Sequence, residues 1–279
     1  MTAPDTRTVT REAKHYKSDV KPVWCPGCGD FAVLTAITKA LAQMGIAQED
    51  TAVVTGIGCA ARLPGYLNVY GLHGIHGRAL PAATGLKLAR PELTVLAAGG
   101  DGDGFSIGGN HFLHACRRNV DLVYIVMDNE VYGMTKGQAS PTTEPDWSES
   151  RLTPQGPGVE PFHPLSLALI SGANWIGRAF TGDPQTLTHM LVEAVNHPGL
   201  AFLHVLSPCV TYRPEQKDWK KTVRREAFTP TEDPVEAQRV LETDDGFNAG
   251  VLYHGRRPVY APAPEATAGM ADLDREFVL

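Results

Sequence analysis

Leu93-Thr94-Val95-Leu96-Ala97-Ala98 runs directly into Gly99-Gly100-Asp101-Gly102-Asp103-Gly104. The first six residues predict a buried strand, and Ser106 to Arg118 predicts a helix, so the glycines lie between a strand and a helix N-terminus. Glycines there let backbone N–H groups approach an anion, and the helix dipole favours negative charge. Asp101 would repel a phosphate unless a cation lay between them. Because Mg²⁺ prefers oxygen ligands, the turn predicts Mg²⁺ bridging the protein and a phosphate-bearing ligand.

A second predicted strand, Val120 to Met127, ends at Asp128-Asn129-Glu130-Val131-Tyr132-Gly133. The carboxyl ends of parallel strands lie at one edge of a sheet, so Asp101 and Asn129 can share a metal ion. Asn129 follows Asp101 by 28 positions, and this arrangement resembles the thiamine-diphosphate motif. The resemblance implies that Asp101, Asn129 and the backbone carbonyl of Val131 hold Mg²⁺, which in turn holds the diphosphate of the cofactor.

Two other interpretations of the glycine stretch compete with this one. Gly-Asp-Gly alone is often only a turn. A Rossmann dinucleotide site requires G-x-G-x-x-G, but Phe105 stands where the third glycine belongs. The strands on both sides and the downstream Asn129 favour thiamine diphosphate over both.

The composition is that of an ordinary globular protein. Of the 279 residues, 43% are hydrophobic and 20% charged, which suits one large α/β domain or two small ones. The net charge of −6 comes without a basic block, so we expect no nucleic-acid partner. No apolar run approaches the roughly 20 residues of a membrane span, and residues 1–20 lack a signal-peptide core, so we expect no membrane association and a cytoplasmic location.

Three segments are expected. Residues 1–21 lack apolar periodicity and are interpreted as an N-terminal arm. Residues 22–211 alternate predicted strands and helices, which indicates an α/β domain with a mostly parallel sheet and helices on both faces. Residues 139–164 form a long loop rich in Pro, Ser, Thr and Gly, and such loops are usually functional. Residues 212–279 are polar and Pro-interrupted, and they are interpreted as a tail that wraps a partner.

Four of the five cysteines fall in predicted loops. Cys25 and Cys28 form a C-x-x-C pair, Cys59 follows the strand Thr51–Thr55, and Cys209 follows the strand 200–206. An intracellular chain argues against disulfides and for metal or redox chemistry. Four thiolates suit either a structural Zn²⁺ or a [4Fe–4S] cluster, and their spacing does not decide between them. Cys116 lies within a predicted helix and is interpreted as packed and inert.

These motifs together resemble the β subunit of 2-oxoacid:ferredoxin oxidoreductases over roughly residues 22–215. The matching stretches are Trp24-Cys25-Pro26-Gly27-Cys28-Gly29, Gly56-Ile57-Gly58-Cys59, His76-Gly77-Arg78, Gly100-Asp101-Gly102-Asp103-Gly104, Asp128-Asn129-Glu130-Val131-Tyr132-Gly133-Met134-Thr135, Gly137-Gln138 and Pro208-Cys209.

The resemblance implies a thiamine-diphosphate-binding fold and a specific reaction. Coenzyme A-dependent oxidative decarboxylation of a 2-oxoacid would send electrons through a [4Fe–4S] cluster on Cys25, Cys28, Cys59 and Cys209 to ferredoxin. The resemblance also implies that the reaction can run in reverse and fix CO₂. An α subunit would complete the cofactor site in a dimer of αβ units. The implied cofactor-binding residues are Gly58, Cys59, His76, Gly100, Asp101, Gly102, Asp103, Asn129, Val131, Tyr132, Gly133, Met134 and Thr135.

The substrate is the least determined part of this prediction. Arg62 follows Cys59 by three positions, and a guanidinium there can pair with a substrate carboxylate. A structural salt bridge or a contact with the cofactor's phosphate would explain Arg62 equally well. We favour 2-oxoglutarate over pyruvate. Two further alternatives are a non-redox thiamine decarboxylase or synthase with a structural zinc, and a non-catalytic interaction subunit.

Overall fold

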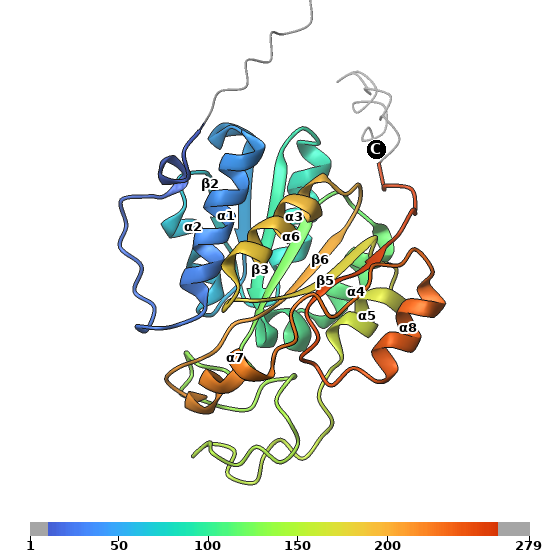
Figure 1. Ribbon diagram of the computed structural model, residues 1–279. Coiled ribbons are helices and arrows are strands. Elements are labelled where there is room, and N and C mark those ends of the chain that lie inside the picture. Colours follow the sequence, from blue (N-terminus) through green and yellow to red (C-terminus); the bar gives the residue numbers. More distant parts are fainter. Residues whose placement is uncertain (1–10, 262–279) are drawn as a thin grey trace, which may run out of the picture.

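The computed structural model describes residues 11–261, in which seven strands form one sheet in the order β2-β1-β3-β4-β6-β5-β7 (Figure 1). Strands β1 to β6 are parallel, and β7 pairs antiparallel with β5 at one edge. The strands are β1 (Thr51–Thr55), β2 (Tyr70–His73), β3 (Thr94–Gly100), β4 (Val123–Asp128), β5 (Trp175–Phe180), β6 (Ala201–Leu206) and β7 (Gly250–His254).

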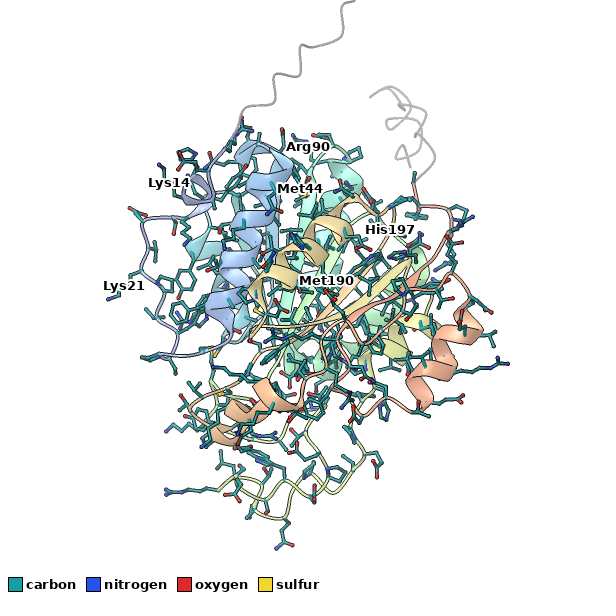
Figure 2. The ribbon with its side chains drawn as sticks, in the orientation of Figure 1. Lys14, Lys21, Met44, Arg90, Met190 and His197 are labelled. Carbon is teal, nitrogen blue, oxygen red and sulfur yellow. The ribbon has the colours of Figure 1, made fainter. Side chains whose placement is uncertain are left out.

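Helices cover both faces of the sheet. On one face α1 and α6 lie side by side (Figure 1). Ile37, Leu41 and Met190 are buried between these helices and the strands, and Figure 2 labels Met190 on α6. On the other face α3, α4, α5 and α8 enclose Phe112 and Phe202. The helices are α1 (Asp30–Met44), α2 (Leu63–Tyr66), α3 (Ala79–Ala89), α4 (Gly109–Arg118), α5 (Pro164–Ile170), α6 (Pro184–Asn196), α7 (Trp219–Thr222) and α8 (Pro234–Glu242).

This architecture confirms the predicted fold class. Every residue of β4, β5 and β6 is buried, as expected for parallel strands covered by helices on both faces. In the described part of the chain, no helix has the length and apolar character needed to cross a membrane. Residues 139–163 contain no helix or strand, as the composition of that segment predicts.

The glycine stretch becomes helical earlier than predicted. Directly after β3, residues Gly102–Ile107 form a π-helical segment (η4), and α4 follows it. The early start depends on close packing, because a Cβ on Gly102 would lie 2.0 Å from the ring of Tyr132. β2 was not predicted, since all four of its residues are exposed on a short edge strand and show no alternation.

Both end segments are more integrated than the sequence suggests. Tyr16 in η1 (Ala13–Tyr16) is fully buried, and its hydroxyl donates to the Ile46 carbonyl at 2.5 Å, so the second half of the predicted arm packs on the domain. The interpretation of residues 212–279 as a tail is wrong for the part up to 254, because β7 completes the sheet and Leu252 is fully buried. Residues 1–10 and 262–279 lie outside the described residues.

Candidate active site

A cavity of about 220 Å³ lies at the carboxyl edge of the sheet, among the loops that follow β1, β3 and β4. Its lining includes every residue that the sequence assigned to the cofactor, from Gly58 through Asp101 and Asn129 to Thr135. Asp30, Ile57, Ala60 and Met127 also line it, although the sequence did not single them out. The parallel topology thus brings together residues more than a hundred positions apart, as expected at such an edge.

Asp101 is buried and faces a second carboxyl group. The Thr142 hydroxyl lies 3.1 Å from Asp101 Oδ2 and 2.7 Å from Asp128 Oδ1. Burial and the neighbouring Asp128 carboxylate raise the pKa of Asp101 to about 8. A divalent cation at Asp101 would offset both effects and hold the carboxylate ionised, so this site fits Mg²⁺ by the chemistry of its oxygen donors.

After β4 ends at Asp128, the chain turns sharply into Asn129-Glu130-Val131, the second part of the thiamine-diphosphate motif. Glu130 adopts a left-handed backbone conformation with φ of 54°, which is uncommon outside glycine. The side-chain oxygen of Asn129 accepts from the Val131 N–H at 3.2 Å, which holds these two predicted ligands in one turn. Thr143 donates to the Glu130 carbonyl at 2.6 Å, so the long loop 139–164 fastens this turn from the other side.

Asp103 joins two loops at the cavity wall. Its Oδ1 accepts from the backbone N–H groups of Ile57 at 2.9 Å and Gly77 at 2.8 Å, and it lies 2.7 Å from His76 Nδ1. Asp103 Oδ2 is buried without a hydrogen-bond partner in the described structure. The carboxylate therefore fixes the loops after β1 and β2, while its cofactor role stays a prediction.

The four loop cysteines lie in one region. Cys28, Cys59 and Cys209 are half-buried and Cys25 is exposed. The Trp24 indole donates to the Cys59 carbonyl at 2.8 Å, and the Gly29 N–H donates to the Pro208 carbonyl at 3.3 Å. Three separate loops are thereby held together. Within residues 11–261, no three His, Cys, Asp or Glu side chains are grouped closely enough to hold a single metal ion.

The thiols influence one another electrostatically. Burial raises the pKa of Cys28 and Cys209, and it raises that of Cys59 to about 12; negative charge on neighbouring cysteines raises each of the three further. A coordinating metal deprotonates such thiols outright. Four thiols on three converging loops are spaced too widely for a single ion, so by their chemistry they suit a larger thiolate-ligated cluster. Cys116 is fully buried in the opposite core cluster, which confirms that it is packed.

Asp30 lies between the cysteine region and the cavity. It is buried, accepts from the Ser207 hydroxyl at 2.8 Å through Oδ1, and leaves Oδ2 without a partner in the described structure. Burial raises the pKa of Asp30 to about 6, although hydrogen bonds from Ser207 and Cys28 oppose the shift. Its place directly after C-x-x-C-G was the available sequence signal.

Arg62 lies outside this cavity. It lines an adjoining space of about 500 Å³ that shares Ile57, Gly58 and Met134 with the first. The Arg62 side chain is exposed and forms no ion pair with a described residue. Its guanidinium is therefore available to a ligand in the neighbouring space.

A chain of buried polar side chains supports Asp128 from behind. Arg178 Nε lies 3.1 Å from His204 Nδ1, and His204 Nε2 lies 2.8 Å from Asp128 Oδ2. Because Arg178 can only donate, Nδ1 accepts and Nε2 carries the proton that is donated to Asp128. Burial disfavours ionisation of Asp128, but the bonds from His204 and Thr142 outweigh it and lower its pKa. A histidine and an arginine inside apolar strands were the sequence signal for this chain of contacts.

Comparison with known proteins places this geometry in a family. The model of the thiamine pyrophosphate enzyme C-terminal TPP binding domain matches residues 56–205. The subunit beta of 2-oxoacid:ferredoxin oxidoreductase 2 from Aeropyrum pernix is 36% identical, and the match covers 90% of this chain and 90% of the relative. This chain belongs to the family of 2-oxoacid:ferredoxin oxidoreductase β subunits.

Two further relatives of this β subunit are informative. The 2-oxoglutarate oxidoreductase subunit KorB of Mycobacterium tuberculosis is 45% identical over 199 residues, which are 71% of this chain but only 53% of the relative. A solved 2-oxoglutarate:ferredoxin oxidoreductase from Magnetococcus marinus, with 2-oxoglutarate, coenzyme A and succinyl-CoA bound, superposes with a TM-score of 0.87 at 36% identity, covering 97% of this chain and 92% of that chain.

The matched thiamine region of this β subunit contains Asp101 and Asn129 but only one of the four loop cysteines, Cys59. Cys25, Cys28 and Cys209 lie outside residues 56–205. The family model thus supports the thiamine half of the site, and the thiol half depends on the convergence of loops described above.

Proposed function

We propose that this chain, together with an α subunit, catalyses the coenzyme A-dependent oxidative decarboxylation of a 2-oxoacid, with 2-oxoglutarate as the favoured substrate. Electrons leave through a [4Fe–4S] cluster to ferredoxin, and the same site can run in reverse to fix CO₂. Relatives named for 2-oxoglutarate and the similar structure with 2-oxoglutarate and coenzyme A bound support this assignment.

One observation carries the proposal: a single cavity is lined by oxygen ligands at Asp101 and Asn129 and by a thiol at Cys59. A metal-bound diphosphate at the first place would hold a cofactor within reach of a thiolate-bound cluster at the second.

Separate sets of residues would hold the magnesium ion and the cluster. Asp101, Asn129 and the Val131 carbonyl would hold Mg²⁺ and with it the diphosphate, while Cys25, Cys28, Cys59 and Cys209 would hold the cluster. Bound thiamine diphosphate supplies a nucleophilic carbon and an electron sink for decarboxylation. Around it, Met127 gives the cavity an apolar wall, and Thr142 orients Asp101. The carboxylate that activates the cofactor's aminopyrimidine would come from the α subunit.

The experiment is to co-purify this chain with its α subunit under anaerobic conditions. We expect iron and acid-labile sulfide at about four each per β chain, stoichiometric thiamine, and reduction of a viologen dye that depends on 2-oxoglutarate and coenzyme A. Greater activity with pyruvate would correct the substrate. Zinc without sulfide would instead support the non-redox thiamine enzyme, and a complex without thiamine would support a non-catalytic subunit.

A further inference from the structure

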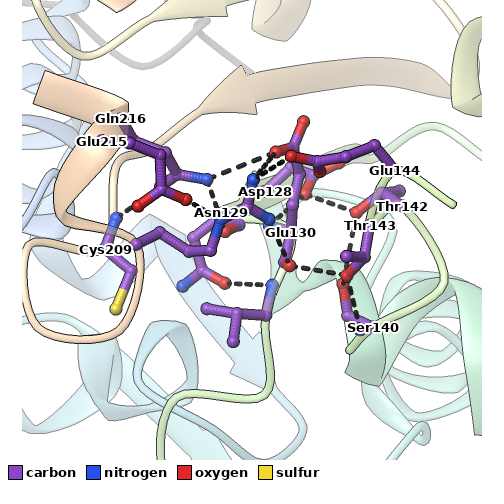
Figure 3. A network of polar contacts seen from close by, with 12 residues as sticks. Asp128, Asn129, Glu130, Ser140, Thr142, Thr143, Glu144, Cys209, Glu215 and Gln216 are labelled. Carbon is purple, nitrogen blue, oxygen red and sulfur yellow. Dashed lines mark hydrogen bonds and ion pairs between the residues drawn. The ribbon is translucent and has the colours of Figure 1, made fainter. Parts of the chain in front are cut away.

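Gln216 is a buried amide that joins the two halves of the site. It lies in η5 (Pro214–Asp218) and is only 1% exposed. Its Oε1 accepts from the Cys209 N–H at 2.9 Å, and its Nε2 donates to the Asn129 carbonyl at 2.9 Å (Figure 3). One side chain therefore spans the loop that carries a predicted cluster cysteine and the turn that carries two predicted Mg²⁺ ligands.

The orientation of this amide is fixed. Nε2 also lies 3.3 Å from Glu130 Oε2, so the nitrogen end faces two acceptors and the oxygen end faces one donor. A flipped amide would set N–H against N–H at Cys209 and oxygen against oxygen at the turn. Because water does not reach Gln216, losing the side chain would leave the Cys209 N–H without a partner, which is costly in a buried site.

Arg213 reinforces the same junction. It is 2% exposed, donates to the Glu130 carbonyl at 3.1 Å, and pairs with Glu144 and Glu215, each at 2.5 Å (Figure 3 labels both acids). Its guanidinium also stacks over Trp147 at 4.5 Å from the ring centroid. The Cys209 segment, the Asn129 turn and the long loop are thus fastened together, so a shift of the cysteine loop is transmitted to the turn.

We infer that Gln216 is a positioning residue that couples the thiol site to the magnesium site, so that occupation of either site stabilises the other. This inference rests on the proposed function. Coupling of binding free energies is reciprocal, so Mg²⁺ and thiamine diphosphate slow the loss of the cluster, and the cluster tightens the cofactor. The coupling passes through the Cys209 N–H and the Asn129 carbonyl rather than through any ligand side chain.

The test uses the αβ complex. Chelation and dialysis remove Mg²⁺ and thiamine diphosphate, and the protein is then divided into two samples. Air is admitted with and without Mg²⁺ and thiamine diphosphate, and the decay of the cluster's visible absorbance is followed. In the wild type the cofactor slows the decay roughly fivefold or more. In Gln216→Met that ratio falls to near one. Lys217→Met, an exposed neighbour in the same helical turn, keeps the wild-type ratio.

A Gln216→Met complex with the wild-type protection ratio would overturn the inference, and so would a wild type with both groups but no protection. If Gln216→Met assembles no cluster, Gln216→Glu replaces it and is assayed above the pKa of the new carboxyl, because the ionised glutamate retains an acceptor for the Cys209 N–H but has no donor for the Asn129 carbonyl. Its cluster persists and its protection is lost. A wild type lacking sulfide or thiamine would instead refute the proposed function, which the initial metal and thiamine analysis detects.

Discussion

Asp101 is the residue on which the proposed cofactor binding depends most directly. Replacing it with Ala removes the buried carboxylate that would hold Mg²⁺, so we expect the purified αβ complex to lose its thiamine while the fold persists. Thiamine content after gel filtration measures the effect. Asp50→Ala provides the control, because Asp50 is exposed at the amino end of β1, opposite the site. Normal thiamine in the Asp101 variant would contradict the assignment of Asp101 as a magnesium ligand.

The cysteines allow a matched comparison within one chain. Cys59 lines the cavity, whereas Cys116 is fully buried in the opposite core cluster. We expect Cys59→Ser to abolish or strongly reduce bound iron and sulfide, because a hydroxyl is a poor substitute for a soft thiolate ligand. Cys116→Ser should keep both while lowering stability, because it places a hydroxyl in an apolar core. Equal iron in the two variants would remove Cys59 from the ligand set.

Substitution of Arg62 tests the proposed preference for 2-oxoglutarate. Its exposed guanidinium lines the space beside the cofactor cavity, so it can reach a carboxylate of 2-oxoglutarate. Loss of one charge-assisted pair in Arg62→Leu should cost about 1.5–3 kcal/mol, roughly ten- to a hundredfold in kcat/KM. Kinetics with 2-oxoglutarate and pyruvate measure it, and a second-carboxylate contact predicts a larger loss for 2-oxoglutarate. Unchanged efficiency on every 2-oxoacid would show that Arg62 does not bind substrate.

Among the elements, β7 shows that the C-terminal segment up to residue 254 is part of the folded domain. Leu252 is fully buried against the sheet, so Leu252→Ala should lower the free energy of unfolding by about 2–5 kcal/mol. Denaturant unfolding of the variant measures this. Val235→Ala, on α8 with 57% of its side chain exposed, should change stability little. An equally small effect at Leu252 would restore the interpretation of this segment as a tail.

Some of the elements could be predicted from the sequence and others could not. β1 matches its predicted bounds, because an apolar run of strand-forming residues is a local signal. β7 escaped prediction because its pairing with β5 is antiparallel and distant in sequence. The early turn into η4 escaped because it depends on Tyr132 packing against Gly102, a contact across 30 positions that no local pattern encodes.

Some parts of the candidate site could likewise be predicted from the sequence and others could not. That Asp101 and Asn129 line one cavity was predictable, because parallel topology brings the ends of these strands together. The contact partners of Gln216 and His204 were not predictable, since they depend on which buried atoms face these side chains. Nothing in the local sequence indicates that a glutamine in a polar segment will be buried. The contacts of such buried polar groups therefore require the structure, whereas the proximity of the two proposed magnesium ligands follows from the order of strands.

At the scale of the whole molecule, large apolar side chains are exposed around the carboxyl edge of the sheet. Ile57, Ile75, Ile107 and Met134 are between 41% and 70% exposed, and Ile57 and Met134 also line the cofactor cavity. Such a rim is typical of a surface that a partner covers. Because the proposed α subunit must complete a cofactor site at this edge, we expect it to bind here.

Ile75→Asp tests this docking, since Ile75 is 70% exposed and its change should leave the isolated chain folded. A buried charge at the interface should weaken association with the α subunit by roughly 2–4 kcal/mol, about thirty- to a thousandfold in Kd, and reduce the viologen-linked activity in parallel. Ile170→Asp, 72% exposed on α5, serves as the control and should associate normally. Titration calorimetry or gel filtration of mixed subunits measures both variants. Full activity of the isolated chain would remove the need for a partner at this edge, and normal association of the Ile75 variant would place the partner on another face.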